Sequence, residues 1–347
     1  MESPLVVIVG PTASGKSALA MEIARSIRDS AALRLEAVLA RQRDSQASRT
    51  SGTLKRDSQT GGPEMSKKPA GSSALQIGKL AGLSGAEIIC ADSRTIYRGM
   101  DIGTAKPSQA EQAEIPHHVL DVIEPSEHFT AAEFKRQALE AIEDITSRNK
   151  LPIMAGGTGL YIDGVIFDFS FLPAVAPHER ERLQQMPVQE LQAEISRLGL
   201  PLPENSQNPR HLMRVLETNG TVPVKKGLRA NTLVIGIDID RETVRERIVK
   251  RVDAMVQAGF ETEVQTLHKL YGRDAPGLLA PGYKAFGDYA AGRLGLDEAK
   301  QRFIDADCQL AKRQRTWFRR NPHIKWIKSS SEALKLVQTF LQQNTAK

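Results

Sequence analysis

The stretch LVVIVGPTASGKSALAMEIARSI, residues 5–27, decides the fold. It opens with an apolar run, residues 5–9, which is typical of a strand buried on both faces. GPTASGKS at residues 10–17 fits the pattern G-x-x-x-x-G-K-[ST], and apolar residues at helical spacing follow it. A strand, a glycine-rich turn of this pattern and a helix, in that order, predict a phosphate-binding loop, or P-loop.

The P-loop pattern also predicts which groups hold the anion. Backbone N–H groups of the turn and of the first helical turn can surround a phosphate, and Lys16 adds a point charge. The hydroxyl group of Ser17 can ligate Mg²⁺. The predicted anion site comprises Gly10, Pro11, Thr12, Ala13, Ser14, Gly15, Lys16 and Ser17. The pattern indicates phosphate binding but leaves open whether the phosphate is transferred, hydrolysed or expelled.

Further apolar runs predict the rest of a sheet. They lie at residues 86–91, 119–123, 151–155 and 232–239, and helical segments alternate with most of them. Strands that alternate with helices favour a parallel, doubly wound sheet. The expected fold class is therefore α/β: a P-loop NTPase-like parallel sheet flanked by helices, with a small inserted helical subdomain.

The core of this fold is expected in separate pieces of the chain. Residues 1–28 and 73–167 would form its first part. Residues 209–328 would form its second part, which ends in a basic region. Residues 329–347 would add a C-terminal helix.

Two segments interrupt the pattern of the core. Residues 29–72 are rich in Ser, Arg, Gly, Lys and Gln, so we expect a largely disordered insertion, with a frayed helix over residues 31–41. Residues 168–208 show helical patterning between proline-rich ends. This second segment predicts the small helical subdomain.

The composition favours a cytoplasmic protein with an anionic partner. The net charge is +6 and the pI is near 9.3, which suits a polyanion. Cys90 and Cys308 lack C-x-x-C or histidine spacing, so neither a disulfide framework nor a zinc site is expected. The sequence shows no signal-peptide pattern and no apolar run near the roughly 18 residues of a membrane span. We expect a cytoplasmic monomer.

A second informative segment is ADSRTIYRGMDIGTAKP, residues 91–107. It follows a predicted strand, so it lies at the carboxyl edge of the sheet, where open α/β sheets bind ligands. Asp92 would face the same crevice as the P-loop, where it could hold Mg²⁺ through water or accept a proton from a nucleophile. Arg98, Thr104 and Lys106 would add hydrogen-bonding or cationic groups.

Cations and aromatic rings alternate further along the chain. Between residues 308 and 331 there are seven lysines and arginines and no acidic residue. Trp317, Phe318, His323 and Trp326 are interleaved with them. Phosphate contacts combined with stacking platforms suit RNA, whereas a solvated basic helix is the alternative interpretation.

Together these segments resemble one enzyme family. GPTASGKS, ADSRTIYRGMDIGTAKP, HHVLDVIEP, AGGTGLYI, PGYKAF and QLAKRQRTWFRR occur in the order seen in tRNA dimethylallyltransferases, which prenylate the adenosine next to the anticodon. The resemblance covers about residues 3–28, 85–170 and 205–327. It implies that the P-loop holds the diphosphate of dimethylallyl diphosphate, that this diphosphate is the leaving group, and that Mg²⁺ assists.

The resemblance also implies roles for single residues. Thr12 and Lys16 would act on the diphosphate, and Asp92 would take the proton of adenosine N6 as the N–C bond forms. Thr158 would help to hold the adenosine, which is flipped out of its stack. The residues implied to bind tRNA are Asp92, Ser93, Arg94, Thr95, Thr158, Asn208, Arg210, Arg214, Gly282, Tyr283, Lys312, Arg313, Gln314 and Trp317. The inserted subdomain would also contact the tRNA.

The chain departs from the family pattern at several positions. Asp307 and Cys308 stand where the family usually has Thr-Arg, and that arginine is expected to contact the diphosphate. Lys312 or Arg313 could take its place. Asn208 stands where an acidic residue is usual.

Three other functions fit parts of the sequence. The P-loop alone would suit a small-molecule kinase, although ADSRTIYRGMDIGTAKP favours the prenyltransferase. A degenerate relative that binds tRNA without modifying it would fit the cysteine at position 308. A free adenylate could be the acceptor, although a mononucleotide would not need the basic aromatic region.

Overall fold

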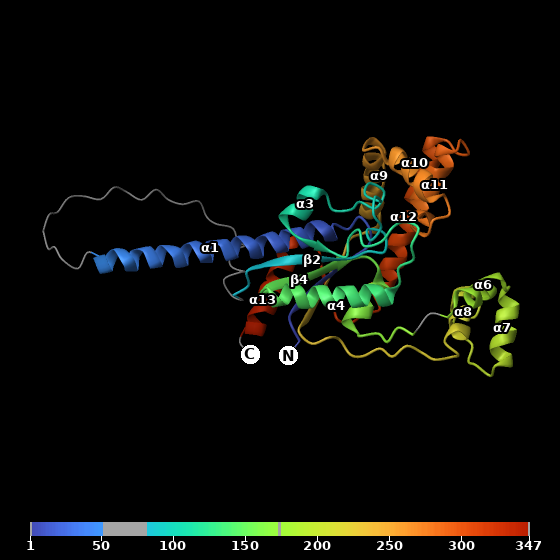
Figure 1. The fold of residues 1–347 in the computed structure, drawn as a ribbon, viewed down its shortest axis with the longest axis horizontal. Coiled ribbons are helices and arrows are strands. Elements are labelled where there is room, and N and C mark those ends of the chain that lie inside the picture. The colour runs from blue at the N-terminus through green and yellow to red at the C-terminus, as the bar shows by residue number, and fades with distance from the viewer. Residues whose placement is uncertain (1, 51–81, 173–174, 346–347) are drawn as a thin grey trace. The chain divides into compact units, whose positions relative to one another are not determined.

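A parallel β-sheet lies at the centre of the fold, which the computed structural model describes for residues 2–50, 82–172 and 175–345. Within these residues the sheet has six strands in the order β3-β2-β4-β1-β5-β6, all parallel (Figure 1). The strands are β1 Leu5–Val9, β2 Gly85–Ala91, β3 His117–His118, β4 Lys150–Gly156, β5 Thr232–Ile237 and β6 Ile324–Ile327. The predicted α/β class with a parallel sheet is confirmed.

Helices cover both faces of this sheet. α1 (Lys16–Thr50) and α13 (Ser330–Thr345) share one hydrophobic core with strand residues such as Ile8 and Ile153. α4 (Ala131–Ser147) packs against β2 and β4. The connection from β1 to β2 and that from β3 to β4 run in opposite directions along the sheet, so right-handed crossovers place α1 and α4 on opposite faces. This double cover explains the near-continuous apolar sequences of β1, β2 and β4.

A helical layer stands beyond the carboxyl edge of the sheet. Its helices are α9 Arg241–Gln257, α10 Phe260–Tyr271, η2 Pro276–Leu279, α11 Pro281–Ala290 and α12 Leu296–Phe318. Two shorter helices lie next to strands in the chain, α3 Gln109–Glu114 before β3 and α5 Gly159–Ile166 after β4. α10, α11 and α12 are joined by ring contacts among Phe260, Tyr283, Phe286 and Phe303. α9 packs along α12, so both helices can present side chains to the edge of the sheet.

Residues Asp163–Leu228 form a unit apart from the first one, which comprises Met1–Ile162 and Arg229–Lys347. Its helices are α6 Pro177–Gln185, α7 Val188–Arg197 and α8 Pro209–Glu217. We predicted α8 to be part of the core, but its buried Leu212 packs in a small cluster with side chains of α6 and α7. An amphipathic helix belongs with the helices that bury its apolar stripe, so this unit extends beyond the predicted residues 168–208.

One predicted strand is wrong and one strand was not predicted. Residues 119–123 do not continue β3, because Val119 and Asp121 have positive φ angles of 59° and 51°. Their backbone is instead tied to the loop after β2, where the N–H of Val122 donates to the carbonyl oxygen of Ile96 (2.8 Å). β6 escaped prediction because its four residues lie inside the basic stretch.

The first helix continues into the segment that we predicted to be disordered. α1 runs without a break to Thr50, so the helix predicted over residues 31–41 is confirmed and the disorder predicted for residues 42–50 is wrong. No glycine or proline occurs between residues 16 and 50, and Ala, Leu and Arg favour helix. Leu35 and Val38 on this extension are 62% and 49% exposed. Residues 51–72 lie outside the described part of the chain.

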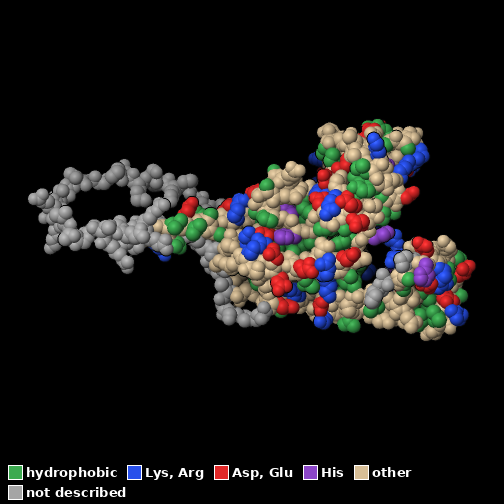
Figure 2. Space-filling model, in the orientation of Figure 1, with side chains coloured by type: hydrophobic (Ala, Val, Ile, Leu, Met, Phe, Trp, Pro, Cys, Tyr) green, Lys and Arg blue, Asp and Glu red, His purple; other side chains and the backbone are tan. Residues whose placement is uncertain are grey.

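The surface carries charges of both signs. Figure 2 shows lysine and arginine side chains intermixed with acidic ones on the visible face. No helix in the described ranges is long and apolar enough to cross a membrane. Because cations and acids are mixed on the visible face, a surface that could bind an anionic partner has to be sought on single elements.

Candidate active site

Three loops meet at the carboxyl edge of the sheet because their strands end at the same level. Val9 of β1 pairs with Gly156 of β4 and with Gly236 of β5, and Ala91 of β2 also pairs with Gly156. The P-loop follows Val9, Asp92 follows Ala91, and the loop with Thr158 follows Gly156. The strand register thus brings together the predicted anion site and the two predicted adenosine-binding positions.

The P-loop has the compact backbone that the motif predicts. Ala13 and Gly15 have positive φ angles of 59° and 94°, and the N–H of Ser14 donates to the carbonyl oxygen of Pro11 (3.2 Å). α1 begins at Lys16, so the N–H groups of its first turn are available to an anion. Ser17 is exposed there, as a ligand for Mg²⁺ would need to be. These residues fit a bound phosphate and its metal ion.

Lys16 lies among charged groups of this edge. Burial lowers its pKa, the nearby carboxylate of Asp92 opposes that shift, and the guanidinium of Arg251 adds to it. Asp307 acts in the same direction as Asp92. One ammonium group is thus coupled electrostatically both to the predicted base and to an ion pair contributed by α9 and α12.

Three buried side-chain atoms of the described residues have no hydrogen-bond partner: Ser14 Oγ, Thr95 Oγ1 and Arg251 Nε. Buried polar groups are normally paired, so unpaired donors at a ligand edge indicate a polar ligand. Ser14 lies in the P-loop and Arg251 is coupled to Lys16, which fits a diphosphate. Arg251 was missed from the sequence because α9 carries several cations that spacing alone cannot rank.

Hydrogen bonds from the Thr158 loop hold the turn that contains Asp92. The hydroxyl oxygen of Thr158 accepts a hydrogen bond from the N–H of Ser93 (3.0 Å), and the N–H of Thr158 donates to the carbonyl oxygen of Ala91 (3.2 Å). Asp92 Oδ1 accepts from the N–H of Arg94 (2.9 Å), which leaves Oδ2 free of any hydrogen bond that the structure shows. A Cβ atom on Gly156 would lie 2.0 Å from the carbonyl oxygen of Ala91, so only glycine permits this approach.

Gln314 connects this loop to the P-loop. Its Oε1 accepts a hydrogen bond from the N–H of Thr12 (2.7 Å), and its Nε2 donates to the carbonyl oxygen of Gly157 (3.0 Å). Gln314 is 9% exposed, so the structure does not bring it to the surface for the predicted tRNA contact. The sequence held a signal for this: Gln314 shares helical spacing with the apolar Ala311 and Phe318, which predicts an inward face.

The opposite face of α12 is exposed and basic. A groove of about 460 Å³ is lined by Gln309, Lys312, Arg313, Thr316, Trp317 and Arg320. Trp317 is 40% exposed, and its indole ring lies against Gly159, beside the Thr158 loop. An aromatic ring among cations next to the catalytic edge is a surface that suits RNA.

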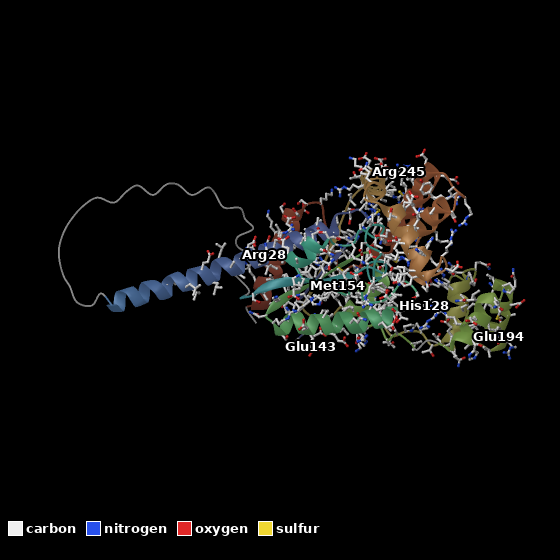
Figure 3. The ribbon with its side chains drawn as sticks, turned by 45° about the horizontal axis from the view of Figure 1, so that its top comes forward. Arg28, His128, Glu143, Met154, Glu194 and Arg245 are labelled. Carbon is white, nitrogen blue, oxygen red and sulfur yellow. The ribbon has the colours of Figure 1, made fainter. Side chains whose placement is uncertain are left out.

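Cys308 lies at a cavity that also borders the P-loop. The cavity holds about 230 Å³, and Pro11, Arg245 and Lys312 are among the residues that line it. Arg245 stands on α9 (Figure 3). Burial raises the pKa of the Cys308 thiol. Of the two cations that could replace the expected arginine, Lys312 lines this cavity and Arg313 does not.

Gly282 and Tyr283, predicted to face the tRNA, are buried instead. Tyr283 is 1% exposed, and its hydroxyl group donates to Glu263 Oε1 (2.6 Å). Gly282 lies against the ring of Phe303. The structure does not bring either residue to a surface that RNA can reach, so we assign Gly282 to packing between α11 and α12 and Tyr283 to packing between α11 and α10.

Side chains later in the second motif hold the loop together. The Lys106 ammonium donates to the carbonyl oxygen of Tyr97 (2.8 Å) and pairs with Asp101 and Asp121. The Thr104 hydroxyl donates to the carbonyl oxygen of Met100 (2.6 Å). Arg98 pairs with Glu124 at 2.7 Å. These predicted site groups are therefore engaged in the architecture of the loop.

The remaining predicted tRNA contacts belong to the unit Asp163–Leu228. Asn208 caps α8, because its side chain accepts a hydrogen bond from the N–H of Arg210 (3.0 Å). Arg210 is exposed, and Arg214 pairs with Glu217 at 3.2 Å. Within this unit, α8 packs its buried Leu212 against α6 and α7.

Comparisons with known proteins agree with this geometry. The family model described as IPP transferase matches residues 95–321. A tRNA dimethylallyltransferase of Bacillus velezensis is 36% identical over 272 residues, which cover 74% of this chain and 86% of that protein. The Bacillus subtilis enzyme of the same name is 30% identical over 342 residues, covering 94% and 91%.

Solved structures give the same result. The full-length tRNA isopentenylpyrophosphate transferase of Bacillus halodurans superposes with a TM-score of 0.65 at 28% identity, over 99% of both chains. A eukaryotic dimethylallyltransferase acting on tRNA shares the fold, with a TM-score of 0.63 at 20% identity over 94% of this chain and 74% of that one. Because the family model matches residues 95–321 and the Bacillus velezensis enzyme is 36% identical over 74% of this chain, this chain belongs to the IPP transferase family of tRNA dimethylallyltransferases.

Proposed function

We propose that the chain transfers a dimethylallyl group from dimethylallyl diphosphate to N6 of the adenosine that is 3′-adjacent to the anticodon of tRNA. The names of its relatives support the reaction class. The observation that carries the proposal is the strand register that aligns Val9 and Ala91 with Gly156, because the P-loop and Asp92 then share one edge of the sheet. Such a pair suits a reaction that expels an anion while a nucleophile loses a proton.

The donor side is built from the P-loop and α9. Free N–H groups at the start of α1, Lys16, Ser14 and Arg251 would surround the diphosphate. Mg²⁺ held by Ser17 would supply further charge stabilisation for the leaving group. These groups are fixed by the fold before the reaction begins, so they stabilise the charge that grows as the C–O bond breaks.

The acceptor side is the Asp92 turn. The N6 atom of adenine attacks the carbon that bears the diphosphate, the N–C bond forms, and the electron pair of the C–O bond leaves with the diphosphate. The N6 proton passes to the free Oδ2 of Asp92. A base stacked in RNA cannot reach this edge, so the adenosine would enter it unstacked.

Transfer of labelled dimethylallyl from its diphosphate to unmodified tRNA, with Mg²⁺, tests the proposal. We expect robust transfer by the native chain and a loss of about 10²- to 10⁴-fold for Asp92→Asn, because a general base contributes about that much. Glu143→Gln is the control, since Glu143 is an exposed acid on α4 (Figure 3) and should leave transfer unchanged.

Two other outcomes would contradict the proposal. Phosphate transfer from ATP to a small acceptor, with no prenyl transfer, would favour the kinase. Binding of tRNA without any transfer at saturating donor would favour the degenerate relative.

A further inference from the structure

A carboxylate competes for one of the cations at the donor side. Asp307 on α12 accepts a hydrogen bond from Nη2 of Arg251 on α9, and the two form an ion pair. The side chains are only 14% and 24% exposed, respectively. The ion pair is therefore shielded from water, and a shielded ion pair is stronger than one at the surface.

This ion pair belongs to the anion site and is not a structural ion pair elsewhere in the fold. Both members act on the pKa of Lys16, and the charged groups that face Asp307 are Arg251, Lys16 and Asp92, from three other elements. The Nε atom of Arg251 is buried without a partner, although Nη2 is engaged by Asp307. Asp307 thus satisfies one end of this guanidinium, whereas the donor at Nε is left without a hydrogen bond.

We infer that Asp307 is an internal counter-ion that weakens diphosphate binding by holding Arg251 and by adding negative charge to the site. The inference rests on the proposed function for the identity of the anion. Asp307 offsets part of the positive charge of a site that holds Lys16, Arg251 and also Arg247, which donates to the carbonyl oxygen of Ser14 (3.3 Å). A diphosphate entering it adds charge that Asp307 repels, and product diphosphate leaves more readily for the same reason.

Protonation of Asp307 would relieve this repulsion. Burial raises the pKa of Asp307, and the ion pair with Arg251 opposes that rise. A bound diphosphate adds a further negative neighbour and raises the pKa again, so binding takes up a proton. The penalty that Asp307 imposes should accordingly be smaller at lower pH.

Binding of inorganic pyrophosphate to the full chain, with Mg²⁺, tests the inference by calorimetry. We expect Asp307→Asn to bind pyrophosphate about tenfold more tightly than the native chain at pH 8, because one nearby like charge is removed from a shielded site. The difference should narrow as the pH is lowered. Asp297→Asn removes the same charge from an exposed position in the first turn of the same helix and should change the affinity less than about twofold.

Other results would overturn the inference. Equal or weaker binding by Asp307→Asn would mean that Asp307 positions Arg251 for the ligand and does not compete with it. Asp307→Thr is a second variant that removes the same carboxylate. Thermal unfolding of each variant shows whether a change in affinity comes from a defect in folding. If neither the native chain nor the variants bind pyrophosphate, the anion site itself is wrong and the inference falls with it. A tenfold gain in a chain that shows no prenyl transfer would contradict only the proposed function.

Discussion

The two ends of the central strands each hold a cluster of charges, and the clusters differ in how completely they are paired. At the amino end of β2, the carboxylate of Glu87 is 2% exposed. It accepts hydrogen bonds from His118 (2.7 Å), Lys150 (2.7 Å) and both Nη atoms of Arg148. Glu87, His118 and Asp144 lie close enough to share a metal ion, but the cations already occupy the carboxylate, so we assign no metal there.

The carboxyl end of the same sheet is left incomplete. Lys16, Asp92, Arg251 and Asp307 gather there, yet Nε of Arg251 remains buried without a partner. A buried charged cluster in which every group is paired stabilises the fold. A buried cluster with unpaired hydrogen-bond donors indicates a site for a ligand. The contrast separates structural from functional charges on one sheet.

Removing the carboxylate at the amino end is expected to have the largest effect on stability. Glu87→Gln leaves three cationic or polar partners facing a neutral amide, and breaking a buried pair costs about 3 kcal/mol. Urea unfolding measures this loss. The turnover of prenyl transfer, assayed well below the melting temperature, should not change. A drop in turnover with unchanged stability would reverse the distinction between the two ends.

The same cluster predicts a dependence of stability on pH. Burial opposes ionisation of Glu87, but the hydrogen bonds from Arg148, Lys150 and His118 outweigh it and lower the pKa from 4.5 to about 2. A lowered pKa stabilises the fold above pH 4.5, and this contribution is lost as the pH falls from 4.5 toward 2. We expect the gap in unfolding free energy between native and Glu87→Gln to shrink by about 2 kcal/mol over that range. A constant gap would mean that Glu87 is not ionised in the fold.

The sequence predicted most of the sheet because strands buried on both faces are apolar throughout. The run at residues 5–9 matches β1, and those at 86–91 and 151–155 lie within β2 and β4. The run at residues 119–123 was misleading, since only pairing with β2 decides where β3 lies. Strand register, which aligns the site loops, is likewise a tertiary property.

The sequence motifs predicted which residues follow the strand ends at the site, but not which motif residues are exposed. The P-loop and Asp92 follow directly from spacing, because a strand end fixes where the next residue lies. Tyr283 and Gln314 occur in equally informative motifs, yet both are buried. A motif identifies residues that a family shares, but only the packing of helices decides which of them face the substrate.

Gln314 tests whether the carboxyl end works as one unit. Gln314→Met keeps the length of the side chain but removes both hydrogen bonds, to Thr12 and to Gly157. We expect kcat to fall about thirtyfold, because the two loops lose their common anchor, while KM for tRNA changes little. Steady-state kinetics with each substrate varied in turn measures this. A raised KM for tRNA at constant kcat would mean that Gln314 contacts the RNA directly.

The smallest effect is expected where the carboxyl end opens onto the surface of α12. Trp317→Ala should weaken tRNA binding about fivefold, because stacking of one base on an aromatic ring contributes about 1–3 kcal/mol. Trp317→Phe should restore most of the affinity.

The dependence of binding on salt separates this ring from its neighbour. Arg313→Ala should reduce the slope of log K against log salt by about 0.7, as expected when one phosphate contact is lost, whereas Trp317→Ala should leave the slope unchanged. Equal slopes for both variants would place Arg313 outside the RNA contact. The functional charges would then be confined to the carboxyl edge of the sheet. Unpaired buried donors, rather than exposed cations, would identify the site.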